Sequence, residues 1–227
     1  LFAALGALAL GVLAGCGGSA PSGAPSYDPT QEAGPVGMRY AGTNERGYDE
    51  YVRGRDGMRM VHVPAGPFLR RPYDGALTRE GESVEVAGFL IDKYEVTNAQ
   101  FAAYLNETGT GTSRVIGGNA RPIFEPMPWG IRRAGDRWEA EKGFESHPAV
   151  GVTAWGAAHY ARWAGGEIPT EDQWMKAAGG PEGREYPFDG KPGPTACNSY
   201  RAGLLGTAPV GSFPACVSAV GCRDMAG

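Results

Sequence analysis

Three cysteines, Cys197, Cys216 and Cys222, are the residues with the widest choice of chemistry. In an oxidising compartment, a Cys197–Cys216 disulfide would close a loop of 18 intervening residues. Chain entropy would then stabilise this turn-rich region by about 3 kcal/mol. A Cys216–Cys222 disulfide is the local alternative, and either pairing leaves one thiol over. The spacing fits no common zinc pattern, so the sequence predicts a disulfide here rather than a metal centre.

No catalytic residue can be assigned among the other side chains. Glu171 and Asp172 fall in the first turn of a predicted helix, where negative charge complements the helix dipole. The three histidines are His62, His147 and His159. His159 falls in the middle of a predicted helix and is interpreted as an exposed or core-edge residue rather than an iron ligand. There is also no glycine-rich phosphate loop and no convincing Ser/His/Asp order.

The first 13 residues form an uncharged apolar run, followed directly by Leu13-Ala14-Gly15-Cys16. This pattern resembles the lipobox of bacterial lipoproteins, which implies cleavage before Cys16 and a diacylglyceryl group on its sulfur. We therefore expect residues 1–15 to be a lipoprotein signal peptide whose start is missing, since neither an initiator Met nor a basic region precedes it. An ordinary signal peptide with a stray cysteine is the alternative. No retention aspartate follows Cys16, which favours the outer membrane of the cell envelope.

Composition separates a tether from a folded domain. The segment after Cys16 is rich in Gly, Pro, Ser and Ala and has few large apolar residues, so residues 16–56 are predicted to be a flexible tether. The whole chain has 37 Gly and 18 Pro among 227 residues, yet 42% of it is hydrophobic. These values indicate a folded, loop-rich domain over 57–227. The net charge of −4 argues against a nucleic-acid partner.

Short strands and helices are predicted within this domain. Apolar residues alternate over 58–64, then 65–68 is predicted to turn, and 83–92 is a second strand-like run after a polar hairpin loop. Two helices begin with capping boxes, Thr97 with Gln100 and Thr170 with Gln173, and a third begins at Thr153. Glycine pairs or single glycines end all three. The tryptophans are expected to form core.

Several ordered motifs resemble the formylglycine-generating enzyme family, also called the sulfatase-modifying factors. The residues that carry the resemblance are Met58, Val61, Pro64, Gly66 and Phe68, then Phe89 and 91–98, 147–152 with Trp155, Ala158, Tyr160 and Trp163, 166–174, 206–211 and 224–227. In the family, the last motif normally continues into Asn-Val-Trp-Glu-Trp, so the domain is expected to be C-terminally incomplete. The resemblance implies an α+β fold related to C-type lectins, with little regular secondary structure.

The resemblance also implies chemistry. Founding members oxidise a cysteine of sulfatases to formylglycine with copper and oxygen, using two cysteines that lie beyond the motifs matched here. Copper is therefore expected only if a further segment carries that pair. Calcium is the other implied metal, with Asn198 and Ser199 at one site and Asp224 and Gly227 at a second. Ala202 stands where the first site would have an aspartate.

Three functions compete at this level. The favoured one is an exported, lipid-anchored lipoprotein of the bacterial envelope whose domain binds a protein or carbohydrate without catalysis. The alternatives are a copper-dependent oxidase that makes formylglycine, with its cysteines in a further C-terminal segment, and a non-haem iron enzyme. The sequence of the C-terminal region of the complete gene would distinguish among these three functions.

Overall fold

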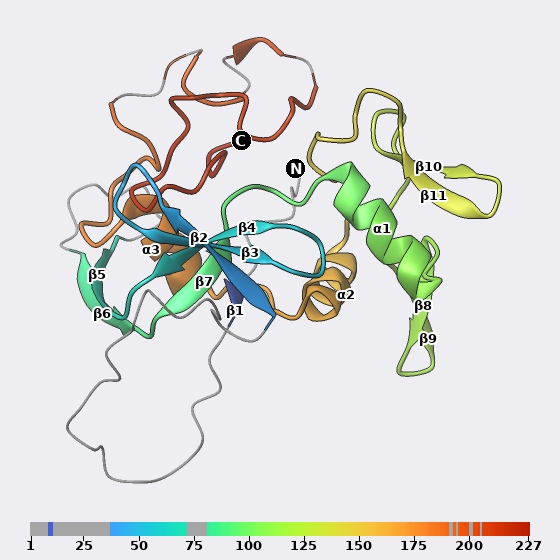
Figure 1. The fold of residues 1–227 in the computed structure, drawn as a ribbon, viewed down its shortest axis with the longest axis horizontal. Coiled ribbons are helices and arrows are strands. Elements are labelled where there is room, and N and C mark those ends of the chain that lie inside the picture. Colours follow the sequence, from blue (N-terminus) through green and yellow to red (C-terminus); the bar gives the residue numbers. More distant parts are fainter. Residues whose placement is uncertain are drawn as a thin grey trace, which may run out of the picture.

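A computed structural model of the chain describes residues 9–10, 37–71, 81–190, 193, 195–199, 202–204 and 206–227. An antiparallel sheet of five strands lies at its centre, in the order β1-β7-β4-β3-β2 (Figure 1). The strands are β1 (Ala9–Leu10), β2 (Met38–Thr43), β3 (Asp49–Arg53), β4 (Arg59–Val63) and β7 (Phe89–Asp92). Three separate hairpins surround this sheet. They pair β5 (Gly66–Arg70) with β6 (Glu82–Val86), β8 (Ser113–Ile116) with β9 (Asn119–Pro122), and β10 (Ile131–Ala134) with β11 (Arg137–Ala140).

Three helices form where the capping pattern predicts them. They are α1 (Asn98–Thr108), α2 (Ala154–Ala164) and α3 (Glu171–Gly179). Thr97 and Thr170 both make complete capping boxes, and the Thr153 side chain caps α2. Gly109 and Gly165 end α1 and α2 in the left-handed conformation, which glycine adopts at little cost. Short helices with short strands confirm the α+β class.

Two of the three inner strands, β4 and β7, are buried on both faces. Met60 and Leu90 pack with α1 and α2 on one side, whereas Val61 and Ile91 pack with α3 and the C-terminal segment on the other. Figure 1 shows α3 on one side of the sheet and α1 with α2 on the opposite side. This alternation follows from the two-residue period of a strand. Short helices of this kind are stabilised mainly by such packing.

A buried ion network joins the sheet to α2. The Arg53 guanidinium donates to Asp92 at 2.9 Å and to Asp56 at 2.7 Å. The Tyr160 hydroxyl donates to the same Asp56 carboxylate at 2.7 Å. Burial raises the pKa of Asp56, but the hydrogen bond and charge of Arg53 outweigh it and hold the pKa below its usual value. Because each charge is paired and hydrogen-bonded, the network can be buried without a free charge.

The structure corrects the predicted start of the domain. The sequence places residues 38–56 in a tether, but β2 and β3 extend the central sheet from within that segment. Tyr51 of β3 is almost fully buried. The compositional argument failed because β2 contains few large apolar residues and lies at the edge of the sheet. The predicted signal peptide, Cys16 and the tether up to residue 36 lie outside the described residues, apart from β1.

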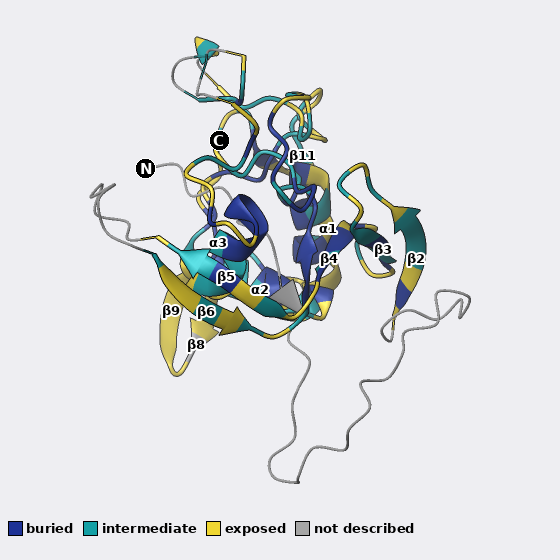
Figure 2. Cartoon of the chain, turned by 90° about the vertical axis from the view of Figure 1, so that its left-hand side faces the viewer, coloured by how far each residue is buried: buried dark blue, intermediate teal, exposed yellow. Residues whose placement is uncertain are grey.

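Three local predictions were also wrong. The predicted turn over 65–68 belongs mostly to β5, and the run over 83–92 divides into β6 and β7. Trp155 is not core: its side chain is 44% exposed, because α2 buries the face that carries Gly156 and Tyr160. Figure 2 shows buried residues gathered at the centre of the fold and exposed residues along the outer β8–β9 hairpin. Among the described residues, no helix has the length and apolar character needed to cross a bilayer.

Candidate functional site

The connection between β7 and α1 carries a partly buried carboxylate, Glu95. Two backbone hydrogen bonds fix this connection: Lys93 N donates to Arg59 O at 2.8 Å, and Ala149 N donates to Val96 O at 2.8 Å. The capping box of α1 then fixes Thr97. Glu95 is thus held between an inner strand and a helix start, and it lines two cavities.

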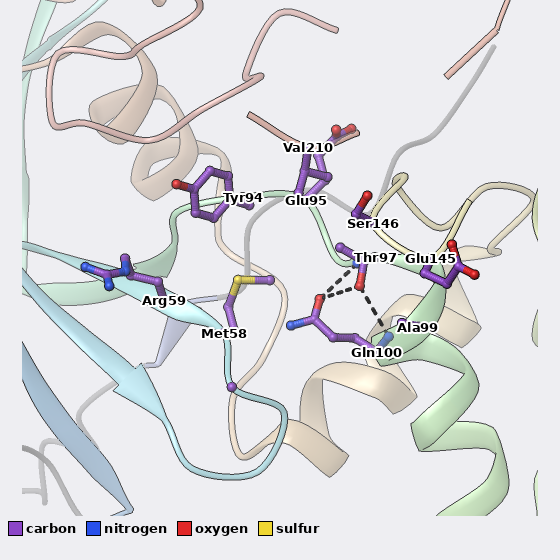
Figure 3. Close-up of a pocket in the computed structure, with 11 residues that line it drawn as sticks. Met58, Arg59, Tyr94, Glu95, Thr97, Ala99, Gln100, Glu145, Ser146 and Val210 are labelled. Atoms are coloured by element: carbon purple, nitrogen blue, oxygen red, sulfur yellow. Dashed lines mark hydrogen bonds between the residues drawn. The ribbon is translucent and has the colours of Figure 1, made fainter. Parts of the chain in front are cut away.

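The first of these, which we call the Tyr94 cavity, has a volume of about 520 Å³. Its lining residues are Gly57, Met58, Arg59, Tyr94, Glu95, Thr97, Ala99, Gln100, Glu145, Ser146 and Val210. Figure 3 shows them around the cavity, with the hydrogen bonds between Thr97 and Gln100 on its floor near α1. The Tyr94 cavity carries charges of both signs, from Arg59 and Glu145.

The second, which we call the Asp224 cavity, has a volume of about 410 Å³. Its lining residues are Glu95, Trp129, Pro148, Val150, Asn198, Ser199, Leu204, Gly206, Thr207, Ala208, Pro209, Phe213, Asp224 and Gly227. Both of its charged side chains, Glu95 and Asp224, are acidic. The apolar side chains come from the loops before α2 and from the C-terminal segment.

Asp224 is held in place by an unusual backbone and by its neighbours. Its φ is +57°, and among the described residues it is the only one other than glycine that has a positive φ. Arg223 N donates to Lys93 O at 2.7 Å, which ties this segment to the chain just before Glu95. The Asp224 carboxylate accepts a hydrogen bond from Gly211 N. Gly211 has φ of +75°, and a Cβ there would lie 2.8 Å from the Tyr94 ring. A glycine is therefore required for this approach.

Burial and the neighbouring Asp224 raise the cost of ionising Glu95. Burial raises the pKa of Glu95 to about 7, with a further contribution from the negative charge of Asp224. Burial also raises the pKa of Asp224, although the Gly211 N–H and the charge of Arg223 act in the opposite direction. Near neutral pH, Glu95 is thus divided between a proton-bearing and an ionised form. The cavity can donate a hydrogen bond in one form and attract a cation in the other.

All four residues predicted to bind calcium line the Asp224 cavity: Asn198, Ser199, Asp224 and Gly227. The two expected sites therefore share one wall, and Gly227 lies against the Asn198 carbonyl. The Asn198 amide donates to Gly206 O, and the Ser199 carbonyl accepts from Ala202 N.

These four residues do not make up a calcium site by themselves. They supply one carboxylate, whereas calcium takes about six to eight oxygens, several of them charged. Among the described residues, no three His, Cys, Asp or Glu side chains are grouped so that they could hold a metal ion. Calcium therefore stays a prediction from the resemblance.

The structure decides between the two possible disulfides. Cys197 is bonded to Cys216, which confirms the first pairing and contradicts the Cys216–Cys222 alternative. Cys222 is a free, buried thiol, and burial raises its pKa to about 12. A thiol with such a pKa is a poor nucleophile and a poor metal ligand at neutral pH. Cys16 lies outside the described residues.

Sequence reasoning missed Glu95 as a site residue. In the sequence Glu95 is only one residue of a family motif, and nothing near it indicates a second carboxylate. Asp224 lies far along the chain and reaches Glu95 only through folding. The available signal was an acidic residue between Tyr94 and Val96, a place where a buried strand gives way to a capped helix.

Comparisons with known proteins agree with this architecture. Residues 50–227 match the family described as the sulfatase-modifying factor enzyme 1-like domain. A formylglycine-generating enzyme of Thermomonospora curvata is 33% identical over 194 residues, which cover 68% of this chain and 64% of that protein. The formylglycine-generating enzyme of Mus musculus is 31% identical, covering 69% of this chain and 53% of that protein.

A third relative has a different printed activity. A hercynine oxygenase of Mycolicibacterium smegmatis is 31% identical over 187 residues, which cover 74% of this chain and 43% of that protein. The chain thus spans less than two thirds of the length of each of these three relatives. With an α+β fold and a family match over 50–227, the chain belongs to the sulfatase-modifying factor family and has its C-type-lectin-like fold.

Proposed function

We propose that this domain is a binding module, and that the Asp224 cavity receives a polypeptide segment with a basic side chain. The observation that carries the proposal is the pair of acidic side chains, Glu95 and Asp224, in one partly closed cavity. A cationic group placed between them would relieve their mutual repulsion. In a partly buried site, such a charged contact is stronger than the same contact in water.

The rest of the cavity wall supports a peptide rather than a small ion. Trp129, Val150 and Phe213 offer apolar surface, while Asn198 and Thr207 offer polar atoms. Pockets that bind organic ligands combine a mostly apolar lining with a few well-placed polar groups. A basic residue flanked by apolar residues matches both parts of this wall.

Peptide titration calorimetry with the full chain tests the proposal. The probe is a short apolar peptide with a central arginine, compared with the same peptide carrying citrulline. We expect the arginine peptide to bind more tightly as pH rises from about 5 to 8, because Glu95 becomes ionised over that range. Glu95→Gln should weaken binding about tenfold at pH 8 and remove most of its pH dependence.

Glu125→Gln is the matched control, since Glu125 is exposed and does not line either cavity. It should leave binding unchanged. Equal binding of the arginine and citrulline peptides, or equal effects of the two variants, would reject the proposed site. Binding of an oligosaccharide but neither peptide would assign the cavity to a carbohydrate.

A second candidate function is the copper-dependent oxidation of a protein cysteine to formylglycine. It is favoured by the identity of 31% and 33% to formylglycine-generating enzymes. In this alternative, the Asp224 cavity would hold part of the substrate, and the reacting cysteines would come from a further C-terminal segment. Copper titration of the complete gene product with a cysteine-containing sulfatase peptide tests it. Absence of both binding and turnover would reject the oxidase.

The third candidate is a non-haem iron enzyme, favoured by the 31% identity to a hercynine oxygenase. Iron-dependent oxygen consumption by the complete gene product would distinguish this activity from copper-dependent oxidation. If neither metal supports turnover while the arginine peptide binds, the binding module is the remaining function.

We further propose that the domain is exported and tethered to the bacterial envelope through lipid on Cys16. The apolar run and the four residues from Leu13 to Cys16 support this proposal. Expression of the complete gene with labelled palmitate tests it. We expect label in the outer-membrane fraction and its loss in Cys16→Ser. Label that persists in this variant would reject lipidation at Cys16.

A further inference from the structure

The hairpin β8–β9 and helix α2 are formed by two segments that contain no acidic residue. Residues 108–124 and 146–166 carry neither Asp nor Glu, although the chain as a whole has a net charge of −4. The basic residues in these segments are Arg114, Arg121 and Arg162, together with two histidines. Positive charge is therefore concentrated in one part of an acidic protein.

The fold brings these basic residues together. Arg114 and Arg121 are direct partners across the β8–β9 pair. The Thr153 hydroxyl donates to Pro122 O at 2.7 Å and so fixes the start of α2 beside the end of β9. His159 and Arg162 are three residues apart in α2 and therefore lie on the same side of the helix. Burial lowers the pKa of His159, and the charges of Arg114 and Arg162 lower it further.

Apolar side chains are exposed beside these charges. Val115 on β8 is 71% exposed, and Trp155 on α2 is 44% exposed. The Arg121 guanidinium lies 5.2 Å from the centroid of the Trp155 ring. We call Arg114, Arg121, Trp155, His159 and Arg162 the arginine face. Val115 follows Arg114 in β8 and pairs with Ala120, so it lies on the other face of the same hairpin. Figures 1 and 2 show the β8–β9 hairpin projecting from the body of the molecule, with exposed residues along both strands.

None of the three arginines forms an ion pair with a described residue. Arg55, in the connection between β3 and β4, pairs with Glu107 of α1. The β10–β11 hairpin shows the opposite arrangement: its Arg132 pairs with Glu139 and Glu141. Arg133 and Arg137 of that hairpin form no ion pair with a described residue, but Asp136 and Glu139 lie in the same hairpin. The β8–β9 hairpin differs in carrying no carboxylate at all.

We propose that the arginine face docks the domain onto an anionic lipid bilayer. The tip of the hairpin would enter the bilayer surface, so that both of its faces touch lipid. The arginines on one face would contact lipid phosphates, while Trp155 and, on the other face, Val115 would enter the interface between head groups and acyl chains. Arginine binds phosphate through a planar fork, and tryptophan is favoured at the boundary between water and lipid. The exposed valine favours a bilayer over a soluble polyanion, because a polyanion offers no apolar layer for it.

The turn of the hairpin suits such a contact. Gly117 and Gly118 both have positive φ, which gives the tight two-residue turn that glycine favours. A narrow turn without large polar side chains can approach head groups closely. The proposed docking uses the arginines, Val115 and Trp155, and it does not depend on lipid at Cys16.

Vesicle sedimentation with the full chain carrying Cys16→Ser tests the proposal. The readout is the ratio of binding to vesicles of phosphatidylcholine with phosphatidylglycerol over binding to vesicles of phosphatidylcholine. Insertion of the apolar N-terminal run does not need anionic lipid, so it contributes equally to binding of both kinds of vesicle and cancels in the ratio. We expect a ratio well above one that falls as salt is added.

Variants localise the effect. Arg114→Gln with Arg121→Gln should lower the ratio by about fivefold for each arginine removed, and Val115→Ser should weaken binding to the anionic vesicles. The control is Arg133→Gln with Arg137→Gln, which removes two charges from the β10–β11 hairpin, where Arg133 also lies over a tryptophan ring. It should leave the ratio unchanged.

Two results would overturn the proposal. One is an equal ratio for the two double variants, each shown to be folded by its thermal transition. The other is an unaltered ratio in Val115→Ser together with tighter binding of a sulfated polysaccharide to the same arginines. That second result would assign the face to a soluble polyanion instead.

Discussion

Glu95 faces a second carboxylate, Asp224, in a cavity that is partly closed to water. Burial and the negative charge of Asp224 both favour the protonated form of Glu95, so the folded protein binds this proton more tightly than the unfolded chain does. A carboxylic acid that titrates near neutral pH can change the charge of a binding site over the range in which cells work. This is the chemical feature on which the proposed binding depends.

Stability should therefore depend on pH through Glu95. In the unfolded chain it titrates near 4.5, and in the folded chain near 7. Between these values the folded protein holds a proton that the unfolded chain releases, so the free energy of unfolding falls as pH rises. We expect the free energy of unfolding of the native protein, relative to that of Glu95→Gln, to fall by up to about 3 kcal/mol between pH 4 and 8. Urea unfolding at a series of pH values measures it, and parallel profiles would contradict the assignment.

Cys222 gives a second prediction for a single residue. Its thiol is buried and its pKa is raised to about 12, so it should resist alkylation in the folded protein. In the Cys16→Ser chain, iodoacetamide should modify Cys222 only when denaturant unfolds the domain. Mass spectrometry after timed labelling provides the measurement. Rapid labelling in native buffer would show that the thiol is accessible.

At the scale of single elements, the sequence predicts best where the determinants are local. The capping boxes of α1 and α3 consist of hydrogen bonds between residues three apart, and both are present as predicted. By contrast, Gly66 and Pro67 favour turns, so the local sequence of β5 predicts a turn. The strand forms because it pairs with β6, far along the chain, and Phe68 becomes buried. That partner is not visible in the local sequence.

Gly156 in α2 allows a test that opposes helix propensity to packing. Alanine is favoured over glycine in a helix by about 1 kcal/mol. A Cβ at Gly156 would, however, overlap the backbone carbonyl of Ile123. We expect Gly156→Ala to destabilise the domain by at least about 1 kcal/mol, and Ala158→Gly to destabilise it by about 1 kcal/mol through propensity. Thermal unfolding compares the two, and a stabilised Gly156→Ala protein would show that the close approach is absent.

For the molecule as a whole, the disulfide fixes a region with little regular structure. Cys197 and Cys216 are 19 residues apart and form a small cluster with Phe188. We expect reduction to lower the free energy of unfolding by about 3 kcal/mol. Differential scanning calorimetry with and without reductant measures the change. The Cys197→Ala, Cys216→Ala double variant is the control, because reductant should not affect it.

The overall class and four residues of the cavity wall could be predicted from the sequence, but the acidic pair could not. Family motifs predicted the α+β fold and the residues Asn198, Ser199, Asp224 and Gly227, which the structure gathers on one wall. Glu95 was missed because its partner is distant in sequence and because burial, not residue type, changes its pKa. The early strands β2 and β3 were missed because composition does not reveal an edge strand that long-range pairing stabilises.

The central claim is that folding brings Glu95 and Asp224 together in one cavity. Carboxyl-carbon NMR titration of Glu95 in the full chain, compared with the Asp224→Asn variant, tests it most directly. We predict a pKa of about 7 in the native protein and a lower value in the variant, since one source of repulsion is removed. A pKa near 4.5 in the native protein, or a pKa unaffected by Asp224→Asn, would contradict the claim.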